Sequence, residues 1–403
     1  MAGMTENSTR PSRILPVIIL SQFAGTSLWF AGNAVLGDLQ RHWNAGADAV
    51  GYVTSSVQLG FIVGTLVFAF FAISDRYSAR KVFFICSLAG ALANLSLYFA
   101  ARDFAAVLTL RVATGFFLAG IYPVGMKIAA GWYQRGLGSA IGFLVGALVL
   151  GTAFPHLLKG LGHEVPWETV TIAVSATAAL GGVLMLLLVP DGPYLVRGAR
   201  FDPRALVLIF RSRPFRCSSF GYFGHMWELY AFWAFVPVVL AAHSAAKGAA
   251  LNIPLWAFCI IGVGALGCAG GGLLSLRVGS APVAFAQLAT SGLCCLFSPL
   301  FFYAPTPVFL AFMLVWGVTV IGDSPQFSAL NAQNAPRELV GSALTIANCI
   351  GFTITIFSIQ LLTWLASVAN AAYLYLPLAI GPVFGLVALA PLVRTRQASY
   401  QSP

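Results

Sequence analysis

Twelve long apolar segments constrain this chain more than any other feature of its sequence. They cover residues 14–37, 49–74, 82–101, 105–130, 138–159, 168–190, 217–241, 254–275, 282–303, 306–328, 341–366 and 372–393. A helix needs roughly 20 apolar residues to cross the hydrocarbon core of a bilayer. Only 8% of the residues are charged, against roughly 25% in soluble proteins. We therefore predict an all-α membrane protein with twelve transmembrane helices.

The loops between these segments are much more basic on one side than on the other. With a cytoplasmic N-terminus, the inner segments hold 17 of the 22 Lys and Arg residues, and the outer loops hold Arg41, Arg102, Lys159 and Lys247. Lys and Arg favour the cytoplasmic side of a membrane. We therefore expect a multi-pass protein of the plasma (inner) membrane with both termini in the cytoplasm. This topology explains the net charge of +10, so no nucleic-acid partner is expected.

The longest polar stretch divides the twelve segments into two groups of six. The predicted organisation is an N-terminal bundle over 1–190, a cytoplasmic linker over 191–216 and a C-terminal bundle over 217–403. Asp202-Pro203 is typical of a helix start, and Pro214 is typical of a stop. We predict a short interfacial helix between them.

The two halves repeat each other at an offset of about 200 residues. Ser74-Asp75-Arg76 after the second segment aligns with Ser275-Leu276-Arg277 after the eighth. RGLGSAIG, from Arg135, similarly matches RELVGSALT, from Arg337. Parallel repeats of this kind place the substrate site between the halves, near the middle of the membrane.

This organisation resembles the major facilitator superfamily over essentially the whole chain. The family's signature in the loop after the second helix is approximately G-x-x-x-D-R-x-G-R-[RK]. This chain keeps Asp75, Arg76, Arg80 and Lys81, and it departs from the signature at Phe71, Ser78 and Ala79. In the second half Gly272, Arg277 and Gly279 match, and Leu276 replaces the acid.

The resemblance implies a gating role for this loop, with Asp75, Arg76, Arg80, Lys81 and Arg277 as its residues. In the family, the loop aspartate is expected to dock on a helix of the other half, and a carboxylate does favour a helix N-terminus. The alternative is that these charges only enforce topology.

Two further motifs lie within the apolar segments. RVATGFFLAG, from Arg111, resembles an R-x-x-x-G motif of proton-coupled members. Gly142 and Gly146 form a GxxxG face that permits close helix approach. That face is either a sliding surface between the halves or static packing.

Four ionisable groups lie deep inside the apolar segments, and such residues usually face an interior cavity. Glu228 lies midway along the seventh segment, His225 precedes it by three residues, and both project from one helical face. We predict that this pair faces the central cavity and carries the coupling proton, with Asp323 as a further candidate. The alternative for Glu228 is a structural hydrogen bond to a neighbouring helix.

Arg111 either polarises the cavity or is held by backbone carbonyls of the first segment. Asp323 precedes Pro325, which loosens a helix, so it is either a titrating site or a hinge partner. Polar and aromatic residues complete the predicted substrate cavity: Gln22, Trp29, Asn33, Gln58, Tyr122, Trp227, Tyr230 and Asn348. A bend is expected at Tyr122-Pro123.

These features predict a secondary active transporter that moves a small solute by alternating access, coupled to protons. Efflux of a small organic compound is favoured. The alternative is uptake or exchange of a small inorganic or organic anion, as in the loosely similar nitrate/nitrite and cyanate porters, or of a carboxylate. Nitrate porters carry an arginine in the second and eighth helices, and this chain has none there.

Other classes fit less well. A non-transporting membrane sensor is a remote alternative, and its expected soluble domain is not found in the sequence. The absence of GxSxG and HExxH motifs argues against an enzyme. The expected partners are the solute, protons and membrane lipid, and the expected state is a monomer. No metal site and no cofactor is predicted.

Overall fold

The computed structural model describes residues 11–133, 137–162, 165–194 and 201–401. Within these ranges the regular elements are all helices, which confirms the all-α prediction. Of the basic residues assigned to the inner side, Arg10, Arg135, Arg197 and Arg200 lie outside the described ranges.

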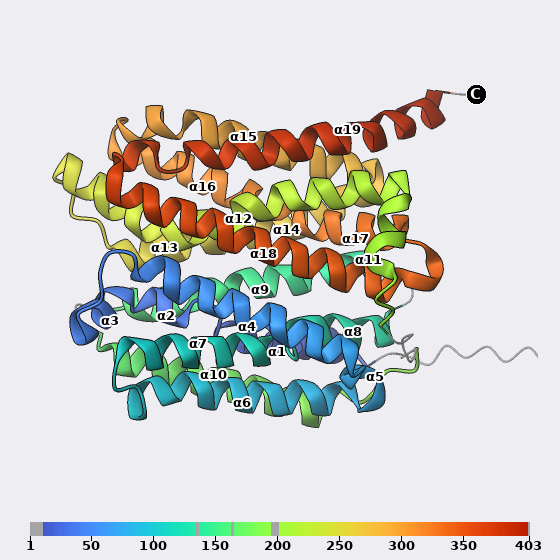
Figure 1. Ribbon diagram of the computed structural model, residues 1–403, viewed down its shortest axis with the longest axis horizontal. Coiled ribbons are helices and arrows are strands. Elements are labelled where there is room, and N and C mark those ends of the chain that lie inside the picture. Colours follow the sequence, from blue (N-terminus) through green and yellow to red (C-terminus); the bar gives the residue numbers. More distant parts are fainter. Residues whose placement is uncertain (1–10, 134–136, 163–164, 195–200, 402–403) are drawn as a thin grey trace, which may run out of the picture.

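The N-terminal half forms one lobe, in the lower part of Figure 1. Its helices are α1 (Ile14–Thr26), α2 (Ala31–Ala34), α3 (Leu36–Trp43), α4 (Ala49–Phe70), α5 (Ile73–Arg76), α6 (Ala79–Phe99), α7 (Phe104–Leu118), α8 (Tyr122–Trp132), α9 (Leu137–Gly160) and α10 (Trp167–Leu188).

The C-terminal half forms the upper lobe of Figure 1. Its helices are α11 (Ala205–Leu208), η1 (Ile209–Arg211), α12 (Arg213–Lys247), α13 (Ile253–Gly262), α14 (Gly264–Val278), α15 (Ser280–Phe302), α16 (Thr306–Gly322), α17 (Ser324–Asn334), η2 (Arg337–Leu339), α18 (Val340–Val368), η3 (Ala371–Tyr373), η4 (Leu376–Ala379) and α19 (Ile380–Gln401).

The described helices agree with the twelve predicted crossings. Eleven helical stretches in the described ranges are long and apolar enough to cross a membrane, and α1 is a shorter apolar helix. Three of the eleven consist of two helices joined by a short turn, namely α7–α8, α13–α14 and α16–α17. Breaks near Tyr122 and Asp323 were expected from Pro123 and Pro325.

The first predicted helix differs from the structure. Residues 14–37 were expected to form one helix, yet α1 ends at Thr26 and turns occupy residues 27–30 before α2 begins. No proline lies in this stretch. The guanidinium of Arg111 donates to the carbonyls of Leu28 and Trp29 within the break, and this tertiary contact stabilises it.

A glycine contact repeats in both lobes and supports the internal repeat. A Cβ on Gly115 of α7 would lie 2.0 Å from the carbonyl oxygen of Val57 in α4. A Cβ on Gly317 of α16 would lie 2.0 Å from the carbonyl oxygen of Ile260 in α13. Only glycine allows backbones to approach this closely. The two pairs occupy corresponding places in the two halves.

The linker region is only partly as predicted. A short helical stretch, α11 followed by η1, does come after Asp202-Pro203. However, Pro214 does not close a helix. It lies in the first turn of α12, where its missing N–H costs no helical hydrogen bond. As a result α12 begins at Arg213, before the predicted start at residue 217.

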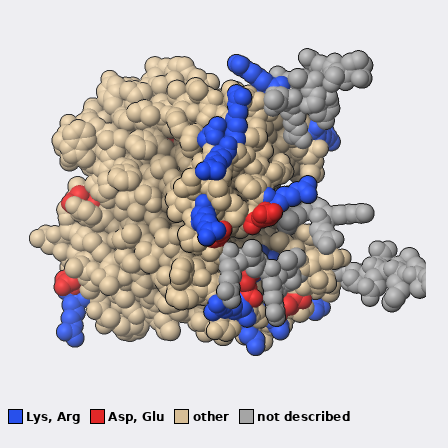
Figure 2. Space-filling view, turned by 45° about the vertical axis from the view of Figure 1, so that its right-hand side comes forward, with Lys and Arg blue, Asp and Glu red and all other residues tan. Residues whose placement is uncertain are grey.

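Charge is concentrated at one end of the molecule. Figure 2 shows most Lys and Arg side chains over the end that carries α5 and α11 in Figure 1. The rest of the face in that view is largely uncharged. This distribution is typical of a protein that presents its sides to lipid and one basic end to the cytoplasm.

Candidate functional site

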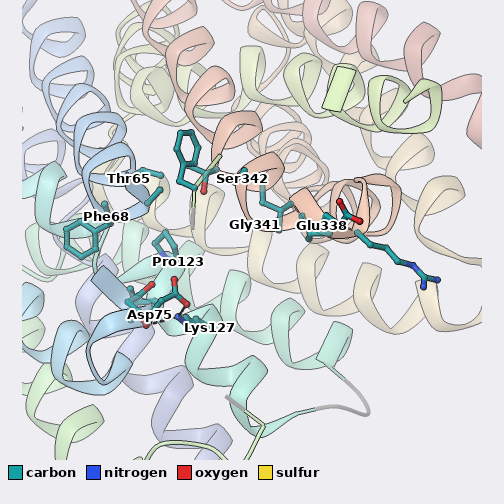
Figure 3. Close-up of a pocket in the computed structure, with 17 residues that line it drawn as sticks. Thr65, Phe68, Asp75, Pro123, Lys127, Glu338, Gly341 and Ser342 are labelled. Carbon is teal, nitrogen blue, oxygen red and sulfur yellow. Dashed lines mark hydrogen bonds and ion pairs between the residues drawn. The ribbon is translucent and has the colours of Figure 1, made fainter. Parts of the chain in front are cut away.

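A cleft between the two lobes opens at the basic end of the molecule. Its volume is about 490 Å³. Thr65 and Phe68 of α4 and Pro123 of α8 line it from the first lobe, and Gly341 and Ser342 of α18 face them from the second (Figure 3). The lobes are therefore separated at this end by a space large enough for a small solute.

The gating loop borders this cleft. Asp75 lies 2.5 Å from the ammonium of Lys127 in α8, within its own lobe, and the first turn of α18 lies across the cleft (Figure 3). Arg80 lies 3.9 Å from Asp191 and donates to the carbonyl of Leu186.

The other predicted gating residues, Arg76, Lys81 and Arg277, are exposed at the surface. The structure thus places Asp75 across the cleft from α18, a helix of the other half. The latch itself stays a prediction.

The opposite end of the molecule is closed. Gln360 of α18 donates to Ser55 of α4 at 2.9 Å, and Asn252 donates to the carbonyl of Gly160 in α9 at 3.0 Å. Nearby, a Cβ on Gly51 would lie 2.2 Å from the hydroxyl of Thr363. The lobes are therefore in contact here and apart at the basic end.

Aromatic rings from both lobes meet in the middle. The ring of Trp29 lies 5.7 Å from that of Tyr230 and 5.6 Å from that of Phe352. Phe61 lies 4.4 Å from Phe352, and Tyr122 lies 6.4 Å from Trp29. We call Trp29, Phe61, Tyr122, Tyr230 and Phe352 the central ring cluster. It contains three of the residues predicted for the cavity.

The predicted amides lie beside this cluster. Gln58 accepts from the indole N–H of Trp29 at 3.2 Å, and Asn33 donates to Thr54 at 2.7 Å. Asn348 accepts from the hydroxyl of Tyr222 at 2.8 Å and lines a central space of about 30 Å³. Such a space holds about one water molecule. The centre is closed in this conformation.

Arg111 is not a cavity residue in this structure. Its guanidinium donates to the carbonyls of Leu28 (2.9 Å) and Trp29 (2.7 Å) and to Asn94 (3.0 Å), and it is fully buried. The break after α1 frees these two carbonyls, and Arg111 satisfies them. The second interpretation offered by the sequence fits this geometry, in which Arg111 positions Trp29.

Glu228 faces the interior of its own lobe. Its Oε1 accepts from Ser291 at 2.5 Å, from the indole of Trp316 at 2.7 Å and from the thiol of Cys295 at 3.3 Å. These partners belong to α15 and α16. The expectation that Glu228 faces the gap between the lobes is therefore corrected, because α12 turns this side chain towards the bundle core.

His225 pairs with Asp323. The Nδ1 atom of His225 lies 2.8 Å from Oδ1 of Asp323, and each side chain is 1% exposed. Asp323 occupies the junction between α16 and α17. The two residues are far apart in sequence, and each was predicted as a proton-coupling candidate without a contact between them.

Two other predicted cavity residues lie elsewhere. Trp227 lines a separate apolar pocket between α12, α18 and α19, because it projects away from the first lobe. Gln22 is fully buried inside the first lobe, where its Oε1 would lie 2.0 Å from a Cβ on Gly125. Trp227 and Gln22 therefore have other neighbours than the rings of the central ring cluster.

No sequence motif predicted Ser291, Cys295 or Trp316 as partners of Glu228. Each is an ordinary residue of an apolar segment. The available signal was weak: a buried carboxyl group needs hydrogen-bond donors, but α15 and α16 offer several other donors, so the sequence does not single out these three.

Comparisons with known proteins agree with this architecture. The model of the Major Facilitator Superfamily matches residues 17–359. No curated protein matches the sequence. The fold is similar to that of the MFS proton:xylose symporter XylE bound to 6-bromo-6-deoxy-D-glucose, with a TM-score of 0.73 and 14% identity, covering 95% of this chain and 97% of that one.

The fold is also similar to that of the human organic anion transporter MFSD10 (TETRAN). There the TM-score is 0.69 and the identity 14%, with 94% of this chain and 100% of that chain covered. At such identities the likeness concerns the fold alone.

The chain belongs to the Major Facilitator Superfamily. It is an integral, multi-pass membrane protein that transports a small molecule, and the family consists of transporters and not of enzymes. The similarity to nitrate and cyanate porters is only loose.

Proposed function

We propose that the chain is a secondary active transporter that moves a small organic solute by alternating access in exchange for protons. The observation that carries this proposal concerns α12. One face of this helix lines the gap between the lobes, and another face holds a buried carboxyl group. A single moving helix that carries both can link movement of the solute to movement of the proton.

The geometry of α12 separates these two faces. Met226 and Tyr230 line the central space. Glu228 is two residues from each, so at 3.6 residues per turn its side chain projects roughly 160° away from theirs. A rotation or tilt of α12 that opens the gap therefore also changes the surroundings of Glu228.

The partners of Glu228 make it sensitive to its proton. The indole N–H of Trp316 can only donate, and here it donates to Oε1 of Glu228. A carboxylate accepts all the bonds that the structure shows, whereas a protonated acid carries a donor that must find an acceptor. All three bonds end on Oε1, so a proton would occupy Oε2 and need an acceptor there, and this is the contact that protonation adds. His225 and Asp323 form a second pair at the α16–α17 junction.

The surroundings of the centre favour an uncharged solute. The central space is lined by neutral residues, and the guanidinium of Arg111 is already bonded to three oxygen atoms. This geometry argues against capture of a small anion by Arg111.

For direction we propose efflux. Lys and Arg gather at the end where the cleft opens, and we place that end in the cytoplasm on the positive-inside rule. An open cleft there would accept a solute from the cytoplasm. We further propose the plasma (inner) membrane as the location, and a monomer, because the cleft and the centre are formed within one chain.

A flux assay tests the proposal. The purified protein is placed in liposomes that contain a pH-sensitive dye, and uncharged organic solutes are added one at a time. A transported solute that moves down its own concentration gradient should drive protons across the membrane in the opposite direction, and the dye reports the resulting pH change. Glu228→Gln should abolish this pH-driven net flux while solute exchange continues. Glu168→Gln, at the start of α10, serves as the control. Normal pH-driven flux in Glu228→Gln would contradict the proposal.

A further inference from the structure

We infer that the solute is a flat, uncharged aromatic compound that inserts beside Trp29, between the rings of the two lobes. This inference rests on the proposed function and specifies its substrate class. It starts from the orientation of the rings. The plane of Trp29 makes an angle of 29° with that of Tyr230 and 27° with that of Phe352. These residues belong to opposite lobes, and their faces are roughly parallel.

Parallel rings on opposing lobes leave a slot when the lobes separate. A flat ring needs about 3.5 Å of van der Waals distance to each neighbouring face, so the two faces must be about 7 Å apart. The present centroid distances are 5.6 Å and 5.7 Å. These rings are already in contact, so the lobes must part by about the thickness of one ring, roughly 3.5 Å, to admit it, whereas a puckered saturated ring needs more.

Trp29 is placed where such a movement is possible. It lies in the turn between α1 and α2, and its carbonyl is held by Arg111 instead of by the helix. Its indole N–H is bonded to Gln58. The ring is thus fixed at its edge, and the part of it that stacks on Tyr230 and Phe352 becomes available to a solute when the lobes separate.

Unsatisfied polar atoms surround the same place. In the described part of the chain, Gln58 Nε2, Asn33 Oδ1 and Trp233 Nε1 are buried without a hydrogen-bond partner. Buried polar groups are nearly always paired. Gln58 bonds to Trp29 and Trp233 packs against Tyr230, so both supply donors beside the rings, and the matching solute carries an acceptor at its edge.

The charged groups nearby are already engaged. Arg111 is bonded to Asn94 and two carbonyls, and Glu228 is turned towards α15 and α16. No counter-charge is presented to the ring slot by these groups. An ion would enter this buried place without compensation, at a large desolvation cost.

Equilibrium binding to the purified full-length protein tests the inference. The flat, uncharged probes are benzamide, nicotinamide and indole-3-carboxamide. Cyclohexanecarboxamide keeps the amide of benzamide without its flat ring, and benzoate keeps the ring but adds a charge. Calorimetry should show binding of at least one flat amide, with the saturated and charged analogues at least ten-fold weaker.

Variants locate the site. Trp29→Leu should weaken binding of the flat amide roughly 2- to 10-fold, the range of one aromatic contact, and Trp29→Phe should restore most of it. Gln58→Leu should weaken binding as well. Trp364→Leu is the matched control, because Trp364 is 60% exposed on α18. The Phe variant keeps the test decisive if the Leu variant folds poorly.

Failure of all three flat amides to bind would overturn the inference, as would equal binding of cyclohexanecarboxamide. Unchanged affinity in Trp29→Leu would also overturn it. None of these results bears on the proton-linked flux of other solutes. A saturated solute that moves protons in the liposome assay would refute the substrate class and leave the proposed function standing.

Discussion

Gly115→Ala should destabilise the protein, because α4 and α7 touch through their backbones at this point. The new Cβ would lie 2.0 Å from the carbonyl oxygen of Val57. That oxygen belongs to a helix backbone and cannot rotate away, so the helices must separate by roughly 1 Å to reach a tolerable contact. Overpacking of this kind costs about 1–3 kcal/mol.

Helix propensity acts in the opposite direction. Alanine is about 1 kcal/mol more favourable than glycine inside a helix. The expected net loss for Gly115→Ala is therefore roughly 0–2 kcal/mol after the two effects are combined. Gly317→Ala should lose a similar amount, since its Cβ would lie 2.0 Å from the carbonyl oxygen of Ile260.

Gly146 provides the matched control. Its Cβ would lie 3.5 Å from the carbonyl oxygen of Ala265, an ordinary contact between α9 and α14. Gly146→Ala should therefore be neutral or slightly stabilising. Reversible unfolding by SDS in mixed micelles, followed by circular dichroism, measures all three. The close-contact reasoning is refuted if Gly115→Ala is as stable as Gly146→Ala.

Three further changes probe the gates and the broken helix. Asp75→Asn should slow turnover while solute binding persists, and normal turnover in a flux assay would count against the latch. Arg111→Met should lower the unfolding midpoint by an amount equivalent to about 2 kcal/mol or more, because the buried carbonyls of Leu28 and Trp29 lose their donor. An unchanged midpoint would contradict the idea that Arg111 stabilises the break after α1. Gly51→Val should clash with Thr363 and increase labelling of the end opposite the cleft by a water-soluble reagent, and unchanged labelling would show that this contact does not close that end.

The membrane-spanning helices were predictable because their signal is local. About 20 consecutive apolar residues define a crossing whatever the rest of the chain does. Bends at Tyr122 and Asp323 were predictable for the same reason, since Pro123 and Pro325 disrupt a helix within one turn. The break at residues 27–30 was not predictable, because Arg111 stabilises it from another helix.

Side-chain partners across helices were the least predictable feature. The period of α12 places His225 and Glu228 near each other, but it does not say which neighbouring helix each one meets. Glu228 meets Ser291 and Trp316, and His225 meets Asp323. These pairings depend on the rotation of α12 within its lobe, and a single sequence carries no signal for that rotation.

The distances between the lobes at the two ends of the molecule test the central claim most directly. Ketone-directed spin labels, which leave the native cysteines in place, are attached at Tyr77 and Glu338 beside the cleft and at Ala47 and Val368 at the opposite end. All four positions are exposed. Electron double resonance in lipid nanodiscs then measures both distances before and after a solute and a pH change are applied. Alternating access predicts that one distance shortens as the other lengthens. Distances that stay constant, or that change in the same direction, would contradict it.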